Sequence, residues 1–302
     1  MISFKDLGSY GRLGNQLFQY AFLRTKAEKL KTQFYCPEWI GDNIFTLNDV
    51  SIKTQYFDTS FNYTEFGNGF DRNSLELKDN TNVIGYFQSD MYFSSNDVKK
   101  WFSFNESMFN EVTKKYSDID FANSTALHIR LGDYTTPQLV FYTPRPEYFK
   151  KALQFIGTKN KVLVFSDDAL KAKKYMKGVR ADFIFIENNK DYEDFYLMTK
   201  CRNLICSSSS FSWWAGYLNA YGDKKIVMPQ FWFLPGCGAV NNDIFVEGWT
   251  KIPAHRFYDY YYVKYIPHKI HVLYFRIVKA VLLVQRKGVI DLFKEIKKFL
   301  QR

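Results

Sequence analysis

The chain of 302 residues is 46 % hydrophobic, 24 % charged and 19 % aromatic, a composition that excludes an intrinsically disordered protein and suits one large or two medium domains. Its four cysteines form no C-x-x-C pair and are not spaced with the histidines as zinc ligands, which excludes a disulfide scaffold and a zinc-ligand cluster. The formal net charge is +10, but residues 251–302 hold 12 Lys and Arg against 3 Asp and Glu, so the rest of the chain is nearly neutral and shows no motif for nucleic acid.

The first 120 residues are expected to form one domain. Short strands are predicted over 2–4 and 83–87, and helices over 15–30 and around 98–109. The polar residues between 41 and 82 predict loops with short strands.

Residues 121–260 alternate between strands and helices and are expected to form a second domain. The predicted elements are strands over 126–129, 161–165, 182–186, 203–207 and 226–228, and helices over 146–155, 168–176, 191–200 and 211–220. This alternation is typical of a parallel α/β sheet. Since ligands of such sheets bind beyond the carboxyl ends of the strands, polar residues that follow the strands are candidate site residues.

The segment 261–302 is expected to add basic amphipathic helices. Apolar residues recur at helical spacing over 289–302, with Lys and Arg between them. Two interpretations stay open, a helix packed on the body with its basic side in solvent, or a contact of 285–302 with an anionic membrane surface. The apolar run 272–284 is interrupted by charges and is shorter than the roughly 20 residues of a membrane span.

Glycines 8, 11 and 14 lie between the first strand and the first helix. Three glycines at steps of three suggest a backbone that approaches another group closely. The spacing differs from the G-x-G-x-x-G dinucleotide fingerprint, which argues against a nucleotide-dependent oxidoreductase. An ordinary strand-to-helix turn is the alternative interpretation.

The motif His128-Ile-Arg130-Leu131-Gly132-Asp133-Tyr134 lies at the end of a predicted buried strand. An arginine here suits a diphosphate because its planar guanidinium donates paired, charge-assisted hydrogen bonds. An Arg130–Asp133 ion pair that closes a turn is the alternative, and His128 could equally be a core histidine. Asp133 is also the carboxylate best placed by sequence to act as a general base.

Two further polar groups follow strands. Asp167 lies in Ser166-Asp167-Asp168, where helix capping alone explains at least one of the three residues. Four serines, 207–210, stand between a strand and a helix that carries Trp213 and Trp214, and the amides of such a turn can bind phosphate.

These motifs together resemble the signature set of the α-1,2-fucosyltransferases of glycosyltransferase family 11. The matching stretches are 11–21, 128–134, 165–168 and 197–214, in family order. The resemblance implies a GT-B-like α/β fold, with two Rossmann-like domains, 1–120 on the acceptor side and 121–260 binding GDP-fucose, facing a cleft and followed by C-terminal helices. It also implies an inverting, metal-independent transfer of fucose to the 2-hydroxyl of a terminal galactose, with no cofactor.

The resemblance also assigns residues. It places Arg130 on the β-phosphate. Arg130 and Asp133 form the expected catalytic pair, and Asp133 is chosen for its position after the strand that carries Arg130, not by the resemblance. The residues expected to bind GDP-fucose are Arg12, Asn15, Gln16, His128, Asp167, Asp194, Ser209, Ser210 and Phe211. Two departures from the family pattern are Leu131, in place of a second arginine, and Ser208, in place of asparagine.

The competing hypothesis is a catalytically weak or inactive relative that binds a nucleotide sugar or a glycan. Leu131 and Ser208 favour it, whereas the retained Arg130 and the turn at 209–214 argue against it. The N-terminus shows no secretory signal pattern and the cysteines are typical of free thiols, so a cytoplasmic location is expected, with 285–302 as a candidate peripheral contact on the inner membrane face. A galactose-terminated oligosaccharide is the expected acceptor, and no nucleic-acid partner is expected.

Overall fold

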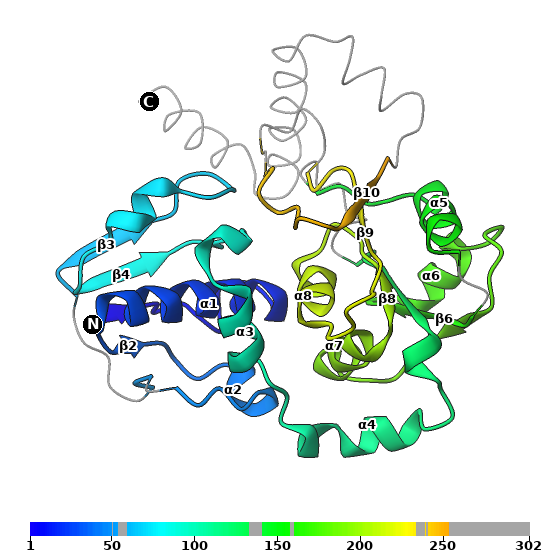
Figure 1. Ribbon diagram of the computed structural model, residues 1–302, viewed down its shortest axis with the longest axis horizontal. Helices are drawn as coiled ribbons and strands as arrows, with labels where there is room; N and C mark the ends of the chain where they lie inside the picture. Colours follow the sequence, from blue (N-terminus) through cyan, green and yellow to red (C-terminus); the bar gives the residue numbers. More distant parts are fainter. Residues whose placement is uncertain are drawn as a thin grey trace, which may run out of the picture.

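The computed structural model describes residues 1–49, 51–53, 59–132, 141–157, 160–233, 239 and 241–253. Asp133 and the helices expected over 261–302 lie outside the described residues. The described part of the chain forms two parallel β-sheets, one from each half (Figure 1). The predicted α/β class is therefore confirmed, and the two sheets are the GT-B-like arrangement that the motifs implied.

The N-terminal sheet has four parallel strands in the order β2-β1-β4-β3. Its strands are β1 (Ile2–Ser3), β2 (Phe34–Tyr35), β3 (Phe61–Thr64) and β4 (Thr81–Ile84). The α-helices of this half are α1 (Leu13–Leu30), α2 (Gly41–Ile44), α3 (Ser95–Trp101) and α4 (Asn110–Lys115). Single 3₁₀ turns cover Arg72–Glu76, Asp90–Tyr92, Glu106–Phe109 and Phe121–Asn123.

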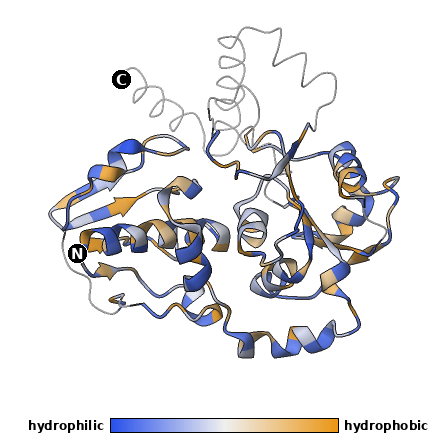
Figure 2. Cartoon of the chain, in the orientation of Figure 1, coloured by the Kyte–Doolittle hydropathy of each residue, from blue (hydrophilic) through white to orange (hydrophobic). Residues whose placement is uncertain are grey.

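Helix α1 is buried on nearly every side, and 13 of its 18 residues are buried. A helix that is covered all round must have a packing partner on each face. On one side α1 packs against β1 and β2, and on the other it meets α8 of the second half, as Figure 1 shows. The outer helix α4, in contrast, is largely hydrophilic (Figure 2).

The C-terminal sheet has six parallel strands in the order β10-β9-β8-β5-β6-β7. Its strands are β5 (Thr125–Ile129), β6 (Val162–Ser166), β7 (Phe183–Phe185), β8 (Asn203–Ile205), β9 (Ile226–Pro229) and β10 (Thr250–Ile252). The helices are α5 (Pro146–Ile156), α6 (Ala169–Tyr175), α7 (Asp191–Lys200) and α8 (Ser210–Leu218).

Alternate residues of the central strands enter two different cores. Ala126, Leu163 and Phe165 join the cluster that holds Trp213 and Trp214. Leu127, Val162 and Val164 instead pack under α5 with Tyr148 and Phe149. Because successive side chains of a strand point to opposite faces, both faces of this sheet are covered, which is the usual state of a parallel sheet.

Three element predictions need correction. Strand β9 was expected to be the last strand, but β10 pairs with it in parallel, an interaction between three-residue segments that leaves no periodic pattern to read. The strand expected over 83–87 ends at Ile84, because Phe87 takes a left-handed backbone conformation with φ of 51° and cannot continue a strand. The helix expected around 98–109 is interrupted, because α3 ends at Trp101, Phe104 forms an isolated β-bridge with Phe45, and only a 3₁₀ turn covers Glu106–Phe109. The remaining predicted strands and helices are confirmed to within a few residues.

The two halves share one hydrophobic core. The ring of Phe18, in α1, lies 4.5 Å from that of Trp213 and 4.9 Å from that of Trp214, both in α8. Phe93 and Phe102 of the first half also contact Trp214, with ring centroids 5.3 and 5.4 Å away. Among the described residues, no helix is long and apolar enough to span a membrane.

Candidate functional site

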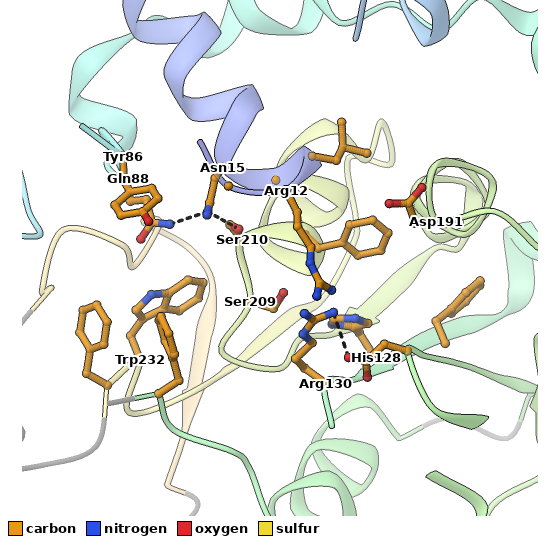
Figure 3. A pocket seen from close by; sticks show the side chains of 18 of the residues that line it. Arg12, Asn15, Tyr86, Gln88, His128, Arg130, Asp191, Ser209, Ser210 and Trp232 are labelled. Carbon is orange, nitrogen blue, oxygen red and sulfur yellow. Dashed lines mark hydrogen bonds and ion pairs between the residues drawn. The ribbon is translucent and has the colours of Figure 1, made fainter. Parts of the chain in front are cut away.

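A cavity of about 530 Å³ lies where the two halves meet, and residues of both halves line it (Figure 3). Its size falls within the roughly 300–1,000 Å³ of pockets that bind small molecules and cofactors. The second half contributes residues that follow β5, β6, β8 and β9, so the cavity lies beyond the carboxyl ends of the strands, as expected.

Nine of the eleven predicted site residues line this cavity. They are Arg12, Asn15, His128, Arg130, Asp167, Asp194, Ser209, Ser210 and Phe211. Asp133 lies outside the described residues. Gln16 was expected to bind the donor, but it is not among the lining residues.

Gln16 instead holds the glycine turn together. Its Nε2 donates to the carbonyl oxygens of Gly8 and Gly11, each at 3.0 Å, and its side chain is buried. Gly8 and Gly11 have φ of 93° and 96°, a left-handed conformation that glycine adopts without strain. The side chain of Gln16 therefore stabilises the turn that carries Arg12 into the cavity.

Gly14 provides the close backbone approach that the glycine spacing predicts. A Cβ atom at this position would lie 2.5 Å from both the Phe211 nitrogen and the Ser210 carbonyl carbon. The first turn of α1 therefore rests directly on the backbone of the first turn of α8. Only glycine permits this separation, because any other residue would place its Cβ inside the neighbouring peptide.

Asn15 connects the two halves at the edge of the cavity. Its Oδ1 accepts hydrogen bonds from Gln88 Nε2 at 2.8 Å and from Ser210 Oγ at 2.7 Å (Figure 3). Gln88 belongs to the first half and Ser210 to the second. Asn15 was expected to bind the donor, and these hydrogen bonds show that it also holds the wall of the cavity in place.

Arg130 forms an ion pair with Asp167, with 2.9 Å between Nη1 and Oδ2. The same carboxylate accepts from the amides of Leu131 at 2.8 Å and Gly132 at 3.0 Å. Asp167, which was predicted to bind the donor, therefore also positions Arg130 and the turn that follows β5. A guanidinium has five N–H donors, so this pair sets its plane without exhausting its capacity.

The N-terminus of α8 opens into the cavity beside Arg130. Its first residues, Ser210 and Phe211, and the preceding Ser209 all line the cavity. In the described part of the chain, no side chain caps this helix. Because the first amides of a helix lack intrahelical partners and carry the positive end of its dipole, they suit an anion.

Two arginines add positive charge at the same place. Arg12 comes from the glycine turn of the first half and Arg130 from the end of β5, and Figure 3 shows their guanidinium groups pointing toward one another. Like charges that converge are stabilised by an anion between them. The centre of the cavity is therefore chemically suited to an anion.

The serines before α8 are held by neighbouring groups. Ser207 Oγ lies 2.8 Å from His128 Nδ1, and Ser208 Oγ donates to the Phe231 carbonyl oxygen at 2.9 Å. Burial, followed by the nearby Arg130 charge, lowers the pKa of His128 to about 3, so its imidazole is neutral at pH 7. The shorter side chain at 208 thus still anchors its loop.

One end of the cavity carries carboxyl groups. Asp191 and Asp194, in the first turn of α7, line it. Burial raises the pKa of Asp194 to about 7, although Asn189 Nδ2 donates a hydrogen bond to it at 2.8 Å and acts in the opposite direction. This carboxyl group can therefore gain or lose a proton near neutral pH.

The opposite end of the cavity is aromatic and was missed by sequence reasoning. Figure 3 shows Tyr86, Gln88 and Trp232 at this end, and the lining also includes Asn68, Phe141 and Phe233. Tyr86 lay inside the strand expected over 83–87, so it was not considered as a residue that follows a strand. Trp232 follows β9, but the search for polar residues after strands passed over it because it is aromatic. A search for aromatic residues at the same positions would have found Trp232, within Phe231-Trp232-Phe233.

Within the residues that the structure describes, no group of three or more His, Cys, Asp or Glu side chains is placed to hold a metal ion. The cavity has three regions that follow one another in space from one end to the other. A carboxyl end adjoins α7, a cationic centre adjoins α8, and an aromatic end adjoins the turn after β4 (Figure 3).

The chain was compared with known proteins. The family model described as glycosyl transferase family 11 matches residues 6–253. The O-antigen biosynthesis glycosyltransferase WbnK of Escherichia coli is 30 % identical over 235 residues, which covers 73 % of this chain and 74 % of that protein. An alpha-1,2-colitosyltransferase of Escherichia coli is 28 % identical, covering 74 % of this chain and 90 % of that protein.

A galactoside alpha-(1,2)-fucosyltransferase 1 of Bos taurus is 23 % identical over 49 % of each chain. Among solved structures, the NodZ alpha-1,6-fucosyltransferase soaked with GDP-fucose aligns with a TM-score of 0.48 and 12 % identity, covering 72 % of this chain and 91 % of that one. POFUT1 in complex with GDP-fucose aligns with the same TM-score and identity, covering 75 % of this chain and 96 % of that one.

Proposed function

Since the chain belongs to glycosyl transferase family 11, we propose that it transfers L-fucose from GDP-fucose to the 2-hydroxyl of a terminal galactose, with inversion at the anomeric carbon. This membership confirms the family resemblance of the sequence motifs. One observation carries the proposal: Arg12, Arg130 and the N-terminus of α8 converge on the centre of one cavity. The relatives whose names specify α-1,2 fucosyl or colitosyl transfer support the proposed linkage.

The donor fits the three regions of the cavity in order. Its diphosphate would occupy the cationic centre, where Arg130, Arg12 and the amides at 209–211 donate. Its guanine would lie at the carboxyl end, where Asp194 can accept from the N1–H and 2-amino groups. Its fucose would then extend toward the aromatic end.

The reaction breaks the bond between the anomeric carbon and the β-phosphate oxygen and forms a bond from that carbon to the acceptor 2-oxygen. Positive charge builds on the sugar ring while negative charge builds on departing GDP. Arg130 and the N-terminus of α8 line the centre of the cavity, where the diphosphate would lie, so they would stabilise the leaving group without reorganisation. The acceptor proton must pass to a base.

Asp133 is the proposed base because it follows the strand that carries Arg130, although it lies outside the described residues. Asp133→Asn removes the ability to take a proton while keeping the size of the side chain. We expect its kcat to fall with little change in GDP-fucose affinity. Full activity of this variant would remove Asp133 from the proposal.

The arginines and the helix terminus supply the positive charge that a divalent cation supplies in other nucleotide-sugar sites. We therefore propose that turnover needs no metal ion. Activity should be unchanged after dialysis against EDTA, and restoration of lost activity by added Mg²⁺ or Mn²⁺ would contradict this part of the proposal.

The decisive experiment incubates the purified chain with GDP-fucose, with and without a panel of galactosides, and follows GDP release. Acceptor-dependent release is expected, with NMR of the product showing an α-1,2 linkage. A product of another linkage would correct the regiochemistry. Binding of GDP-fucose by calorimetry without release on any galactoside would instead favour the hypothesis of a catalytically inactive relative.

A further inference from the structure

We propose that the turn 85–88 forms the acceptor subsite and that Tyr86 is the surface on which the acceptor sugar ring stacks. This inference rests on the proposed function and adds the acceptor side to it. The ligand class is a pyranose with one apolar face, such as a terminal galactose. None of the residues 85–88 belongs to the sequence motifs that were assigned to the donor site.

The turn is held in a strained conformation by one buried and one half-buried polar side chain, Gln19 and Glu65. Phe87 has φ of 51°, which a bulky residue adopts only at a cost and only where the surroundings enforce it. Glu65 Oε2 accepts from the amides of Tyr86 and Phe87, both at 2.8 Å. Gln19 Nε2 donates to the Gly85 carbonyl oxygen at 3.2 Å. Such strain is often concentrated at binding sites.

The strained turn presents an aromatic ring to the cavity. Tyr86 lines the cavity and keeps 39 % of its surface exposed, although large aromatic side chains are usually well buried. Tyr10 stacks on it with ring centroids 4.7 Å apart and planes inclined by 15°. The ring is therefore supported from one side by a second aromatic ring, which gives a ligand a rigid, preorganised surface.

The position of Tyr86 points to the acceptor rather than to the nucleotide. In Figure 3, Tyr86 and Gln88 lie at one end of the cavity and Asp191 at the other, with Arg12 and Arg130 between them. A donor with its guanine at the carboxyl end and its diphosphate on the arginines directs its fucose toward Tyr86. The nucleophilic hydroxyl must approach the fucose from that same end.

The chemistry of this end suits a sugar. The C3, C4 and C5 hydrogens of galactose lie on one face of the ring, and polarised C–H groups interact favourably with the negative face of an aromatic ring. Gln88 adds an amide group beside Tyr86 (Figure 3), and Asn68 adds another to the lining of the cavity. A mostly apolar and aromatic lining with a few polar groups is typical of specific ligand sites.

Two hydrogen bonds join the second half to the first, one at the turn 85–88 and one at Phe70. Asn241 Nδ2 donates to the Gln88 carbonyl oxygen at 3.2 Å, and Asp243 Oδ2 accepts from the Phe70 amide at 2.7 Å. The acceptor wall is thus tied to the half that carries the donor groups. This tie keeps the distance between the two substrates defined.

The test compares Tyr86→Ala, Tyr86→Phe and Phe61→Ala in the full chain. Phe61 is a matched control, since it is an exposed aromatic on β3 that does not line the cavity. With lactose as acceptor, Tyr86→Ala should raise the acceptor KM about tenfold or more, the order expected for loss of an aromatic contact. Its affinity for GDP-fucose by calorimetry should stay within about twofold, because the donor lies elsewhere. Tyr86→Phe, which keeps the aromatic ring, and Phe61→Ala should each have an acceptor KM and a GDP-fucose affinity similar to those of the parent chain.

A binding measurement that needs no turnover separates this inference from the proposed function. Saturation-transfer NMR of lactose in the presence of GDP should show contact with the parent chain and lose it in Tyr86→Ala. If turnover fails but this contrast appears, the subsite stands and the transferase proposal falls. An unchanged acceptor KM in Tyr86→Ala, an equal loss of GDP-fucose affinity, or no lactose signal from the parent chain would each overturn the subsite.

Discussion

Arg130 illustrates how a structural contact can serve chemistry. Its ion pair with Asp167 is largely shielded, with side-chain exposures of 14 % and 20 %, and Asp167 is itself held by two backbone amides. The guanidinium therefore keeps one orientation before the donor arrives. A preorganised donor stabilises a developing charge more than a mobile one does, because no reorganisation accompanies the reaction.

We expect Arg130→Ala to lose at least about a hundredfold in kcat, since removal of one such donor costs about 2.7–4 kcal/mol in comparable sites. Arg130→Lys should recover only part of the activity, because lysine restores the charge but not the planar pair of donors. GDP release with acceptor measures the effect.

Arg202→Ala is the matched control, because Arg202 also pairs with an aspartate, Asp223 at 2.7 Å, but away from the cavity. The Arg202→Ala variant should turn over at the rate of the parent chain. Near-parental turnover by a folded Arg130→Ala protein would overturn the assignment of Arg130.

Asp194 predicts a pH dependence of nucleotide binding. Its pKa of about 7 means that the carboxylate, the form that best accepts from guanine, becomes the minor species as the pH falls below 7. Because apparent affinity scales with the competent fraction, the Kd for GDP should rise about tenfold between pH 8 and pH 6. Calorimetric titration of GDP at several pH values measures this.

Asp194→Asn removes the titrating group. Its Kd for GDP should be weaker than that of the parent chain at pH 8 and nearly independent of pH. A flat profile in the parent chain would show that the ionisation of Asp194 is not coupled to nucleotide binding.

At the scale of elements, the contact between α1 and α8 decides the shape of the cavity. Glycine within a helix costs about 1 kcal/mol relative to alanine, and Gly14 lies in the first turn of α1. The close contact with Ser210 and Phe211 explains its presence there. Helix packing, rather than helix propensity, therefore determines this residue.

Gly14→Ala should destabilise the protein despite its better helix propensity. The new Cβ would force α1 and α8 apart, and overpacking of this kind costs roughly 1–3 kcal/mol. We also expect weaker GDP binding, because the amides of α8 would move. Thermal unfolding followed by circular dichroism and calorimetric GDP titration measure the two effects.

Gly222→Ala is the control, because a Cβ there meets no atom within 4 Å. It should leave both the midpoint of unfolding and the Kd unchanged. Equal behaviour of the two variants would mean that the α1–α8 contact can relax without effect on the site.

At the scale of the whole molecule, two sheets do not make two independent units. Interfaces between domains are usually polar and allow motion, but here Phe18, Phe93 and Phe102 of one half pack on the tryptophans of the other. Separation of the halves would expose these rings to water. The apolar contact therefore couples the stability of the two halves.

We expect one thermal unfolding transition in scanning calorimetry, with equal calorimetric and van't Hoff enthalpies. GDP should shift this transition as a whole to higher temperature, because the ligand binds only the native state. Two resolved transitions, with only one of them shifted by GDP, would show that the halves unfold separately.

The basic segment 285–302 leads to a separate prediction at this scale. Each basic residue near an anionic surface contributes about 1 kcal/mol, and six of these residues are Lys or Arg. If the segment contacts membranes, the full chain should sediment with anionic liposomes at low salt more than a chain that lacks 285–302. Neutral liposomes are the control, and equal sedimentation of the two chains would favour a helix packed on the body.

Local patterns in the sequence predicted most elements and much of the site. Alternation of apolar residues every two or 3.6 positions depends only on neighbours along the chain, so the strands and helices of the second half were predicted closely. The motifs around Arg130 and Ser209 could be recognised for the same reason, since the residues of each motif are close in sequence.

Only the tertiary structure decided how these pieces meet. The Gly14–Phe211 approach, the link from Asn15 to Gln88 and Ser210, the pairing of Arg130 with Asp167 and the supported ring of Tyr86 join residues far apart in the chain. Gln16 likewise proved to hold a turn rather than line the cavity. Such contacts depend on the packing of whole helices and sheets, and that packing leaves no periodic signal in the sequence.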